Sequence, residues 1–268
     1  MNTTGGKPDD VTQRPIRVVL FSDPFLAANA DELVSCLSAH ESIDLLAVLC
    51  QGSERGARGR ARDLWKRRGI LGLLIAVVEA ASTGGRAVFS PDRRRRRREA
   101  LAAMQLVPSL HASNVIEKVR RMSPDLGLIY GGPILKPELF RIPRLGTLGI
   151  HHGRLPEYRG KKTTFWEIYH GEREAGVAIQ RVNAGIDTGE VIAQAAIPIG
   201  RKSYPRVWRE VQAAGVNLYM DAILAVAAGT VRPIEATGKP GRLYKDPSPR
   251  QLVDLWLRRM SDGRGRRS

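Results

Sequence analysis

Two polar segments adjoin apolar runs and carry side chains suited to acid–base chemistry. Residues 151–160 read His-His-Gly-Arg-Leu-Pro-Glu-Tyr-Arg-Gly, and residues 184–189 read Ala-Gly-Ile-Asp-Thr-Gly. His151 follows one apolar run, and Asp187 lies between Gly185 and Gly189 on a turn. An imidazole and a carboxylate that meet can orient each other and move a proton. The pair therefore predicts a shared catalytic site at strand ends.

Each residue also has a purely structural interpretation. A single histidine at a strand end is more often a hydrogen-bonding residue than a catalyst. Aspartate favours turns through hydrogen bonds of its own side chain, and the flanking glycines permit a positive φ or a close approach to a ligand. His152, next along the strand, is expected to point to the opposite face from His151.

The surrounding sequence alternates strand and helix patterns. Apolar runs predict strands, whereas spaced apolar positions predict helices. Strands are expected at 16–21, 43–50, 105–107 (an edge strand), 125–130 and 148–151, with a hairpin of 176–182 and 191–199; helices are expected at 28–38, 55–68, 70–82, 114–122 (with Ser113 as N-cap), 164–170 and 204–228.

This order predicts an α/β fold, with an open, mainly parallel, twisted sheet and helices on both faces. Residues 1–15 are expected to be a disordered tail, 16–230 a single compact catalytic domain, and 231–268 a partly ordered C-terminal extension. The strand ends would place His151 and Asp187 at the sheet edge where such folds bind ligands.

Composition limits the functional classes. Hydrophobic residues make up 43% of the 268 residues, as in a globular protein. The two cysteines have no neighbours at metal-ligand spacing, so we expect neither a disulfide framework nor a metal site. We find no signal peptide and no membrane-spanning stretch, and we expect a cytoplasmic protein. The sequence leaves the oligomeric state open.

Basic residues are in large excess, with a formal net charge of +16 at pH 7. Arginines concentrate between residues 54 and 99 and include the run Arg93–Arg98. Such a cluster can bind a polyanion by releasing counterions. No aromatic residues are interspersed in the run to stack on bases. We therefore favour a solvated loop or helix start there, with nucleic-acid binding as the less favoured interpretation.

The two polar segments resemble the signature of the folate-dependent formyltransferases, which include glycinamide ribonucleotide transformylase and methionyl-tRNA formyltransferase. The Leu-Pro-x-x-Arg-Gly loop matches at Leu155, Pro156, Arg159 and Gly160, and the Gly-x-Asp-Thr-Gly turn matches at 185–189. The stretch Gly-Gly-Pro-Ile-Leu at 131–135 is similar to the family's pteridine-binding loop, although Gly-Gly-Pro on its own could simply end a strand.

The resemblance implies formyl transfer from 10-formyltetrahydrofolate to an amine. It implies His151 and Asp187 as catalytic residues, a folate site at Ile134, Leu135, Gly185, Ile186 and Asp187, and an acceptor loop containing Leu155, Pro156, Arg159 and Gly160. One position differs, because Gly149 stands where the family has an asparagine that would donate to the oxyanion.

The acceptor is not specified by these motifs. The C-terminal part is too short for the barrel domain of the tRNA enzymes, so we favour a small-molecule amine such as an amino sugar. Three alternatives remain: a catalytically weak enzyme, a non-catalytic folate-binding or regulatory protein, and an RNA-linked or methionyl-tRNA formyltransferase. At Gly149, His152, Thr147 or a water molecule could replace the missing donor.

Overall fold

The structure is a computed structural model that describes residues 14–23, 30–52, 102–234 and 241–264. Its strands are β1 (Ile16–Ser22), β2 (Ile43–Gln51), β3 (Met104–Val107), β4 (Leu126–Tyr130), β5 (Thr147–His151), β6 (Tyr158–Gly160), β7 (Glu174–Arg181), β8 (Val191–Pro198) and β9 (Arg242–Tyr244). Its helices are α1 (Ala30–Ala39), α4 (Ser113–Met122), α5 (Pro137–Phe140), α6 (Thr163–Tyr169), α7 (Tyr204–Ala227) and α8 (Pro249–Arg264).

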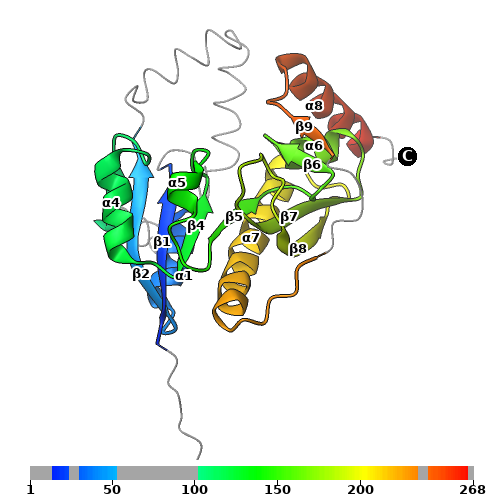
Figure 1. Cartoon of the computed structure of the whole chain (residues 1–268). Coiled ribbons are helices and arrows are strands. Elements are labelled where there is room, and N and C mark those ends of the chain that lie inside the picture. The colour runs from blue at the N-terminus through cyan, green and yellow to red at the C-terminus, as the bar shows by residue number, and fades with distance from the viewer. Residues whose placement is uncertain (1–13, 24–29, 53–101, 235–240, 265–268) are drawn as a thin grey trace, which may run out of the picture.

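The main sheet has seven strands in the order β3-β2-β1-β4-β5-β7-β8 (Figure 1). The first five of these are parallel to one another, and β7 and β8 continue the sheet as an antiparallel hairpin. The predicted α/β class with a mainly parallel sheet is confirmed. A second, two-stranded sheet pairs β6 with β9.

Helices cover both faces of the parallel part because side chains alternate along each strand. On β1, Val18 and Leu20 pack in one cluster with α1 and α7, whereas Val19 and Phe21 pack in another with α4 and α5. Every one of these four side chains is fully buried. The near-continuous apolar run read from the sequence reflects this burial on two sides.

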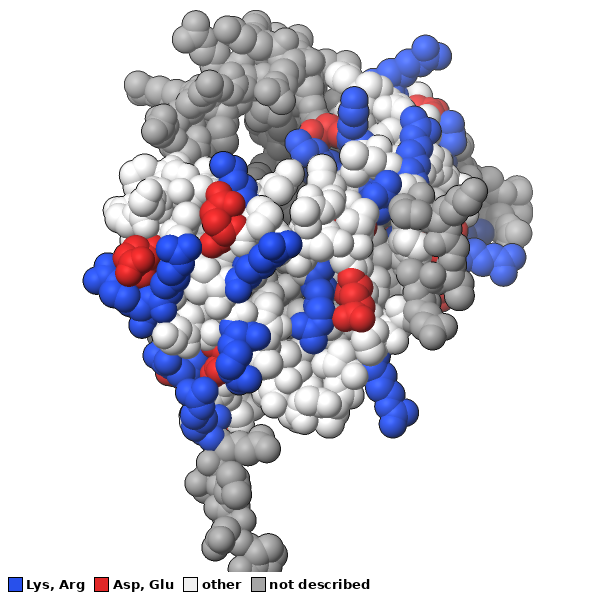
Figure 2. All heavy atoms as spheres, in the orientation of Figure 1, with Lys and Arg blue, Asp and Glu red and all other residues white. Residues whose placement is uncertain are grey.

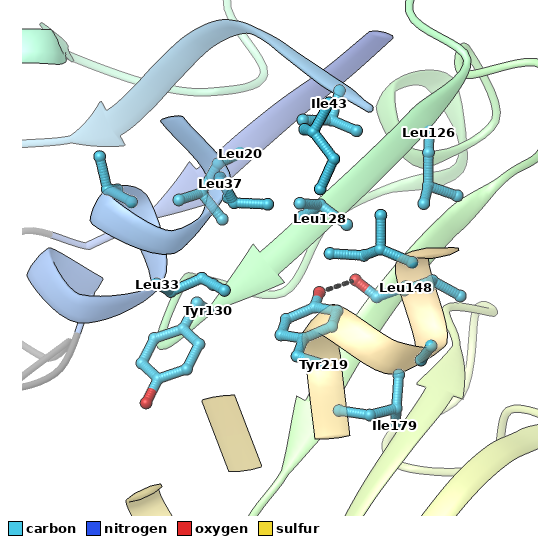
Figure 3. Close-up of a cluster of buried hydrophobic side chains, with 14 of the residues drawn as sticks. Leu20, Leu33, Leu37, Ile43, Leu126, Leu128, Tyr130, Leu148, Ile179 and Tyr219 are labelled. Atoms are coloured by element: carbon cyan, nitrogen blue, oxygen red, sulfur yellow. Dashed lines mark hydrogen bonds between the residues drawn. The ribbon is translucent and has the colours of Figure 1, made fainter. Parts of the chain in front are cut away.

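Tyr219 of α7 ties the helix to the sheet directly before the candidate site. Its hydroxyl donates to the Leu148 carbonyl (2.7 Å; Figure 3). The same hydroxyl oxygen lies 3.0 Å from the backbone nitrogen and 3.1 Å from the backbone oxygen of Ile129. The pairing of β4 with β5 ends there, at Ile129 and Gly149. Beyond this point the two strands diverge into the loops that carry the polar residues.

The structure corrects two details of the sequence interpretation. Ser113 is the first residue of α4 and not its N-cap; the cap position is Ala112, which makes no side-chain cap bond. The segment after Gly241 contains β9 and α8, two elements that the sequence did not predict. The predicted helices at 55–68 and 70–82 and the arginine run at 93–98 lie outside the described residues.

Candidate active site

A cavity of about 450 Å³ opens at the carboxyl ends of β4 and β5. It is bounded by the loop after β4, the end of β5, the turn between β7 and β8, and the first turns of α7. Its lining includes Tyr130, Gly131, Gly132, Pro133, Ile134, Leu135, Gly149, His151, His152, Gly160, Lys162, Thr163, Gln180, Val182, Gly185, Ile186, Asp187, Trp208 and Gln212. The carboxyl edge is where open α/β sheets hold ligands.

His151 and Asp187 meet at this cavity. Nδ1 of His151 lies 3.3 Å from Oδ1 of Asp187, and both side chains are largely buried. The predicted convergence of the two segments is confirmed. Burial excludes competing water, so the interaction between the ring and the carboxylate is stronger than it would be at the surface.

Asp187 is held as an ionised carboxylate. Its Oδ2 accepts the Gly160 backbone N–H (2.8 Å), and its Oδ1 accepts the Gln180 amide (3.0 Å) as well as facing His151. Burial alone raises the pKa of Asp187, but the contact with His151 and the hydrogen bonds from Gly160 and Gln180 outweigh it, and the net pKa is lowered.

The glycines flanking Asp187 do not adopt the positive φ that the sequence suggested for them. The residue with a positive φ is Asp187 itself, at 50°, a region that aspartate tolerates better than most residues. Gly185 and Gly189 are required for space. A Cβ at Gly189 would lie 1.7 Å from the Arg181 carbonyl oxygen, and one at Gly185 would lie 2.1 Å from Oγ1 of Thr188.

Both nitrogens of the His151 ring face acceptors. Nε2 lies 2.6 Å from the Tyr158 carbonyl oxygen, opposite the Nδ1 contact with Asp187. Because a carbonyl and a carboxylate can only accept, a ring carrying a proton on each nitrogen satisfies both. Proton donation from Nε2 to a substrate therefore requires the bond to Tyr158 to break.

The residues expected to bind folate lie together on the wall of the cavity. Ile134 and Ile186 are 72% and 44% exposed, which is unusual for isoleucine, whereas Leu135 is buried behind them. Gly185 and Asp187 complete this part of the wall. The arrangement offers apolar contacts next to the His151–Asp187 pair.

Of the four loop residues, Gly160 alone is part of the cavity wall. Leu155 is buried against Ala178 and Val191. The Pro156 carbonyl accepts the Gly241 N–H (2.9 Å), and the Arg159 guanidinium donates to the Gly241 carbonyl at 2.8 and 3.0 Å. The loop is thus held in place by contacts that Leu155, Pro156 and Arg159 make outside the cavity wall. The contacts of Pro156 and Arg159 are with Gly241 of the C-terminal segment.

Sequence reasoning missed two polar residues, Gln180 at the site and Glu167 beneath the loop that follows His151. Gln180 bridges the turn, since its amide donates to Asp187 while its Oε1 accepts the Gly189 N–H (3.1 Å). A glutamine inside an apolar strand was the available signal. Among the described residues, no group of three or more His, Cys, Asp or Glu is arranged to hold a metal ion.

His152 packs against aromatic rings on the α7 side. Its ring centroid lies 5.1 Å from that of Trp208 and 6.0 Å from that of Tyr130. Burial, and secondarily the neighbouring His151, lowers the pKa of His152 to about 3, so the ring is neutral. Its Nε2 is buried and has no hydrogen-bond partner within the described part of the chain. These contacts agree with the expected opposite orientation of the two histidines.

Glu167 on α6 anchors the loop that follows His151. It is fully buried, and its Oε1 accepts the backbone N–H groups of Arg154 (2.8 Å) and Gly176 (3.0 Å). The other oxygen, Oε2, has no hydrogen-bond partner among the residues that the structure describes. Burial raises the pKa of Glu167 to about 7, although the two backbone donors and the charges of Arg154 and His151 oppose the shift.

This shift predicts a pH-dependent stability. Glu167 retains its proton in the folded state up to about pH 7, above its ordinary pKa of 4.5. Between these values the folded state binds more protons, so the group's contribution to stability falls as the pH rises. We expect Glu167→Gln, which keeps an acceptor for both N–H groups, to gain about 2–3 kcal/mol relative to the wild type between pH 5 and pH 8.

Urea unfolding of both proteins across this range measures the difference. The comparison with the variant matters because His152, with its lowered pKa, makes the wild type more stable as the pH rises towards 6.5. That trend is common to both proteins and cancels in the difference. A difference that does not vary with pH would mean that Glu167 is ionised throughout.

Gly149 lies at the cavity wall where the resemblance led us to expect an asparagine. A Cβ at this position would lie 3.3 Å from Cγ2 of Val182, a tight contact. Val182 is half-buried and packs on the cluster beneath α4 and α5. A larger side chain at residue 149 thus requires Val182 to move by a few tenths of an ångström.

Comparisons with known proteins agree with the motifs. The formyl transferase family profile matches residues 79–223. A methionyl-tRNA formyltransferase from Synechocystis sp. is 30% identical over 224 residues, which is 83% of this chain and 59% of the relative. One from Geobacter sulfurreducens is 37% identical over 108 residues, which cover 38% of this chain and 34% of the relative. The chain thus spans 59% or less of these relatives.

Solved structures share the fold at low sequence identity. Glycinamide ribonucleotide transformylase 1 from Symbiobacterium toebii superposes with a TM-score of 0.58 at 20% identity, covering 87% of this chain and all of that one. A sugar N-formyltransferase from Shewanella sp. gives 0.56 at 15%, covering 90% and 86%. The family profile extends over more than half of the sequence, so this chain belongs to the formyl transferase family.

Proposed function

We propose that this protein transfers a formyl group from 10-formyltetrahydrofolate to the amine of a small-molecule acceptor, with His151 and Asp187 as the catalytic pair. Membership of the family supports the reaction class. The observation that carries the assignment is the contact of 3.3 Å between a buried imidazole and a carboxylate held by two further donors, on the wall of one cavity.

The donor is expected to bind where the cavity presents apolar surface and backbone. A pteridine ring is flat and has hydrogen-bonding edges, and it suits a wall of exposed isoleucines beside backbone N–H and C=O groups. Ile134 and Ile186 provide the former, and the strand-end segment 131–133 and Gly185 the latter. This placement brings the formyl end of the folate towards His151.

The chemistry follows from charge. Attack of an amine on a formyl carbon forms a tetrahedral oxyanion and a cationic nitrogen. The His151 ring donates a hydrogen bond to the oxyanion once Nε2 leaves the Tyr158 carbonyl, and Asp187 orients that ring. Asp187 then accepts the proton that the attacking nitrogen loses. When the oxyanion collapses, the bond from the formyl carbon to N10 of the folate breaks, and this proton passes to the departing N10, which releases tetrahydrofolate and the formylated amine. Its lowered pKa keeps it ionised and ready for this role near neutral pH.

The acceptor is expected at the α7 side of the cavity. That side presents Trp208, Gln212 and the neutral His152, and the Tyr130 hydroxyl donates to Gln212 Oε1 (2.7 Å). Aromatic faces with uncharged polar groups suit a hydroxylated ring such as an amino sugar. Methionyl-tRNA is a second candidate, because the relatives similar in sequence carry that name.

A formyl-transfer assay separates these options. Purified protein is given 10-formyltetrahydrofolate with a panel of amino sugars, or with methionyl-tRNA, and the formylated product is measured. Turnover on an amino sugar supports the proposal, whereas turnover on methionyl-tRNA alone assigns the second acceptor. Tight folate binding without turnover on any amine would indicate a folate-binding protein instead of an enzyme.

Gly149→Asn tests how the site functions without the usual asparagine. We expect kcat/KM to fall about tenfold, because overpacking against Val182 typically costs about 1–3 kcal/mol and displaces the cavity wall. Steady-state kinetics check this.

The double variant Gly149→Asn/Val182→Ala is the control, since it removes the group in tight contact. It should recover most of the lost activity. A single variant faster than the wild type would show instead that the natural site lacks an oxyanion donor that asparagine can supply.

A further inference from the structure

A second cavity lies at the opposite end of the sheet from the candidate active site. It is open, has a volume of about 760 Å³, and adjoins the amino-terminal ends of β1 and β4. The five residues of β4 separate it from the first cavity by about 15 Å. We call it the arginine hollow; its lining is Arg14, Arg17, Arg120, Ser123, Pro124, Asp125, Pro137, Glu138, Arg141, Ile142 and Arg144.

The buried carboxylate of Asp125 holds two of the arginines that line the hollow. It is 4% exposed, and its Oδ2 accepts the Arg17 backbone N–H (3.1 Å). Its Oδ1 accepts the guanidinium of Arg14 (3.1 Å) and two N–H groups of Arg144 (3.0 and 3.1 Å). Burial alone raises the pKa of Asp125, but these donors lower it overall, so the carboxylate is ionised.

The two guanidiniums are thus positioned by a buried group while their outer parts remain accessible. Arg14 and Arg144 have side chains that are 67% and 66% exposed. Each guanidinium has five N–H donors, and the bond to Asp125 uses one in Arg14 and two in Arg144. A ligand that binds here meets donors already ordered, which reduces the entropy lost on binding.

The lining of the arginine hollow carries a net positive charge, with five arginines and two carboxylates, Asp125 and Glu138. Outside the lining, Arg17 and Arg120 also lie 3.7 Å from Asp44 and 3.9 Å from Glu117. Figure 2 shows basic side chains gathered over the lower part of the molecule, near the start of β1. Guanidinium groups match the oxygens of phosphate with paired hydrogen bonds. Among the residues described, no aromatic ring lines the hollow, so the hollow offers donors for anionic oxygens but no surface on which bases could stack.

From these features we propose that the arginine hollow binds a small ligand with two or more linked phosphate groups. A volume of 760 Å³ is in the range of small-molecule sites. Guanidinium N–H groups on several sides of one concavity can bind more than one phosphate at a time. The site is independent of the proposed formyl transfer, because it lies at the other end of the strands.

Calorimetric titration with inorganic tripolyphosphate at low salt tests the proposal. We expect one saturable site per chain, with inorganic monophosphate binding at least about tenfold more weakly. The variant Arg120→Gln/Arg141→Gln removes two charges from the hollow without touching Asp125, so it should fold normally. It should weaken tripolyphosphate binding about tenfold or more.

Arg201→Gln/Arg209→Gln is the matched control, since it removes the same charge from exposed positions elsewhere. It should change the affinity by less than about twofold. An equal loss in both variants, or binding that does not saturate at one site, would overturn the proposal by showing a general charge effect. A short single-stranded RNA that binds more tightly than tripolyphosphate, and through Arg120 and Arg141, would overturn the choice of a small ligand.

Discussion

Asp187→Asn should lower kcat/KM for formyl transfer by about 10²–10⁴-fold, the usual contribution of a general acid or base. An amide carries no charge and is not basic, so it can neither bind the His151 ring as strongly as the carboxylate does nor accept a proton. One side of the amide would also present N–H groups to Gly160 or to Gln180, which themselves donate to this position.

The same measurement on His151→Ala should give a loss of similar size, and the double variant should be little worse, because the two residues act as one unit. Glu190→Gln is the matched control: it makes the same chemical change on the same turn, at an exposed residue paired with Arg181. It should retain near-normal activity. If His151→Ala turns over normally, the catalytic assignment is wrong.

Gly176→Ala should destabilise the fold by about 3 kcal/mol or more, at the upper end of overpacking. A Cβ at this residue of β7 would lie 2.5 Å from the backbone nitrogen and 2.6 Å from the Cα of Arg154. Backbone atoms cannot move aside as a flexible side chain does. The Glu167 side chain accepts a hydrogen bond from each of these two chain segments, so they cannot move apart without losing a buried hydrogen bond.

Urea unfolding measures the loss, and activity should fall with it because the displaced loop carries the Tyr158 carbonyl that contacts His151. Gly52→Ala is the control: among the described residues, a Cβ there meets only the Val107 carbonyl oxygen, at 3.9 Å. That variant should stay within about 0.5 kcal/mol of the wild type. A stable, active Gly176→Ala protein would show that the loop does not require this close approach.

The parallel part of the fold could be predicted from sequence because strands buried on both faces appear as uninterrupted apolar runs. The runs at 16–21, 43–50 and 148–151 all became strands close to the predicted limits. The β7–β8 hairpin was equally clear. The C-terminal β9 and α8 were not predicted. Strand β9 has only three residues, and it pairs with the equally short β6, which is far away in sequence.

The site was predicted in part for similar reasons. Motif spacing was sufficient to bring His151 and Asp187 together. It could not show that Arg159 donates to the Gly241 and Ile186 carbonyls, nor that Glu167 is buried beneath the loop. Both depend on contacts between segments that sequence periodicity does not relate. The catalytic and binding roles of all these residues remain predictions.

The cytoplasmic location remains a prediction, as does the extent of the catalytic domain from residue 16 to residue 230. The arginine run 93–98 lies outside the described residues. Within the described residues, no helix is long and apolar enough to cross a membrane.

The proposed formyl transfer requires a folate site beside His151. Titration of the protein with a reduced folate, followed by calorimetry and by thermal stability, tests it. We predict saturable binding that 10-formyl derivatives compete for, and that Ile134→Asp and Ile186→Asp each weaken, since a charge replaces exposed apolar surface at the cavity. No heat and no thermal shift at millimolar folate would contradict the proposed function.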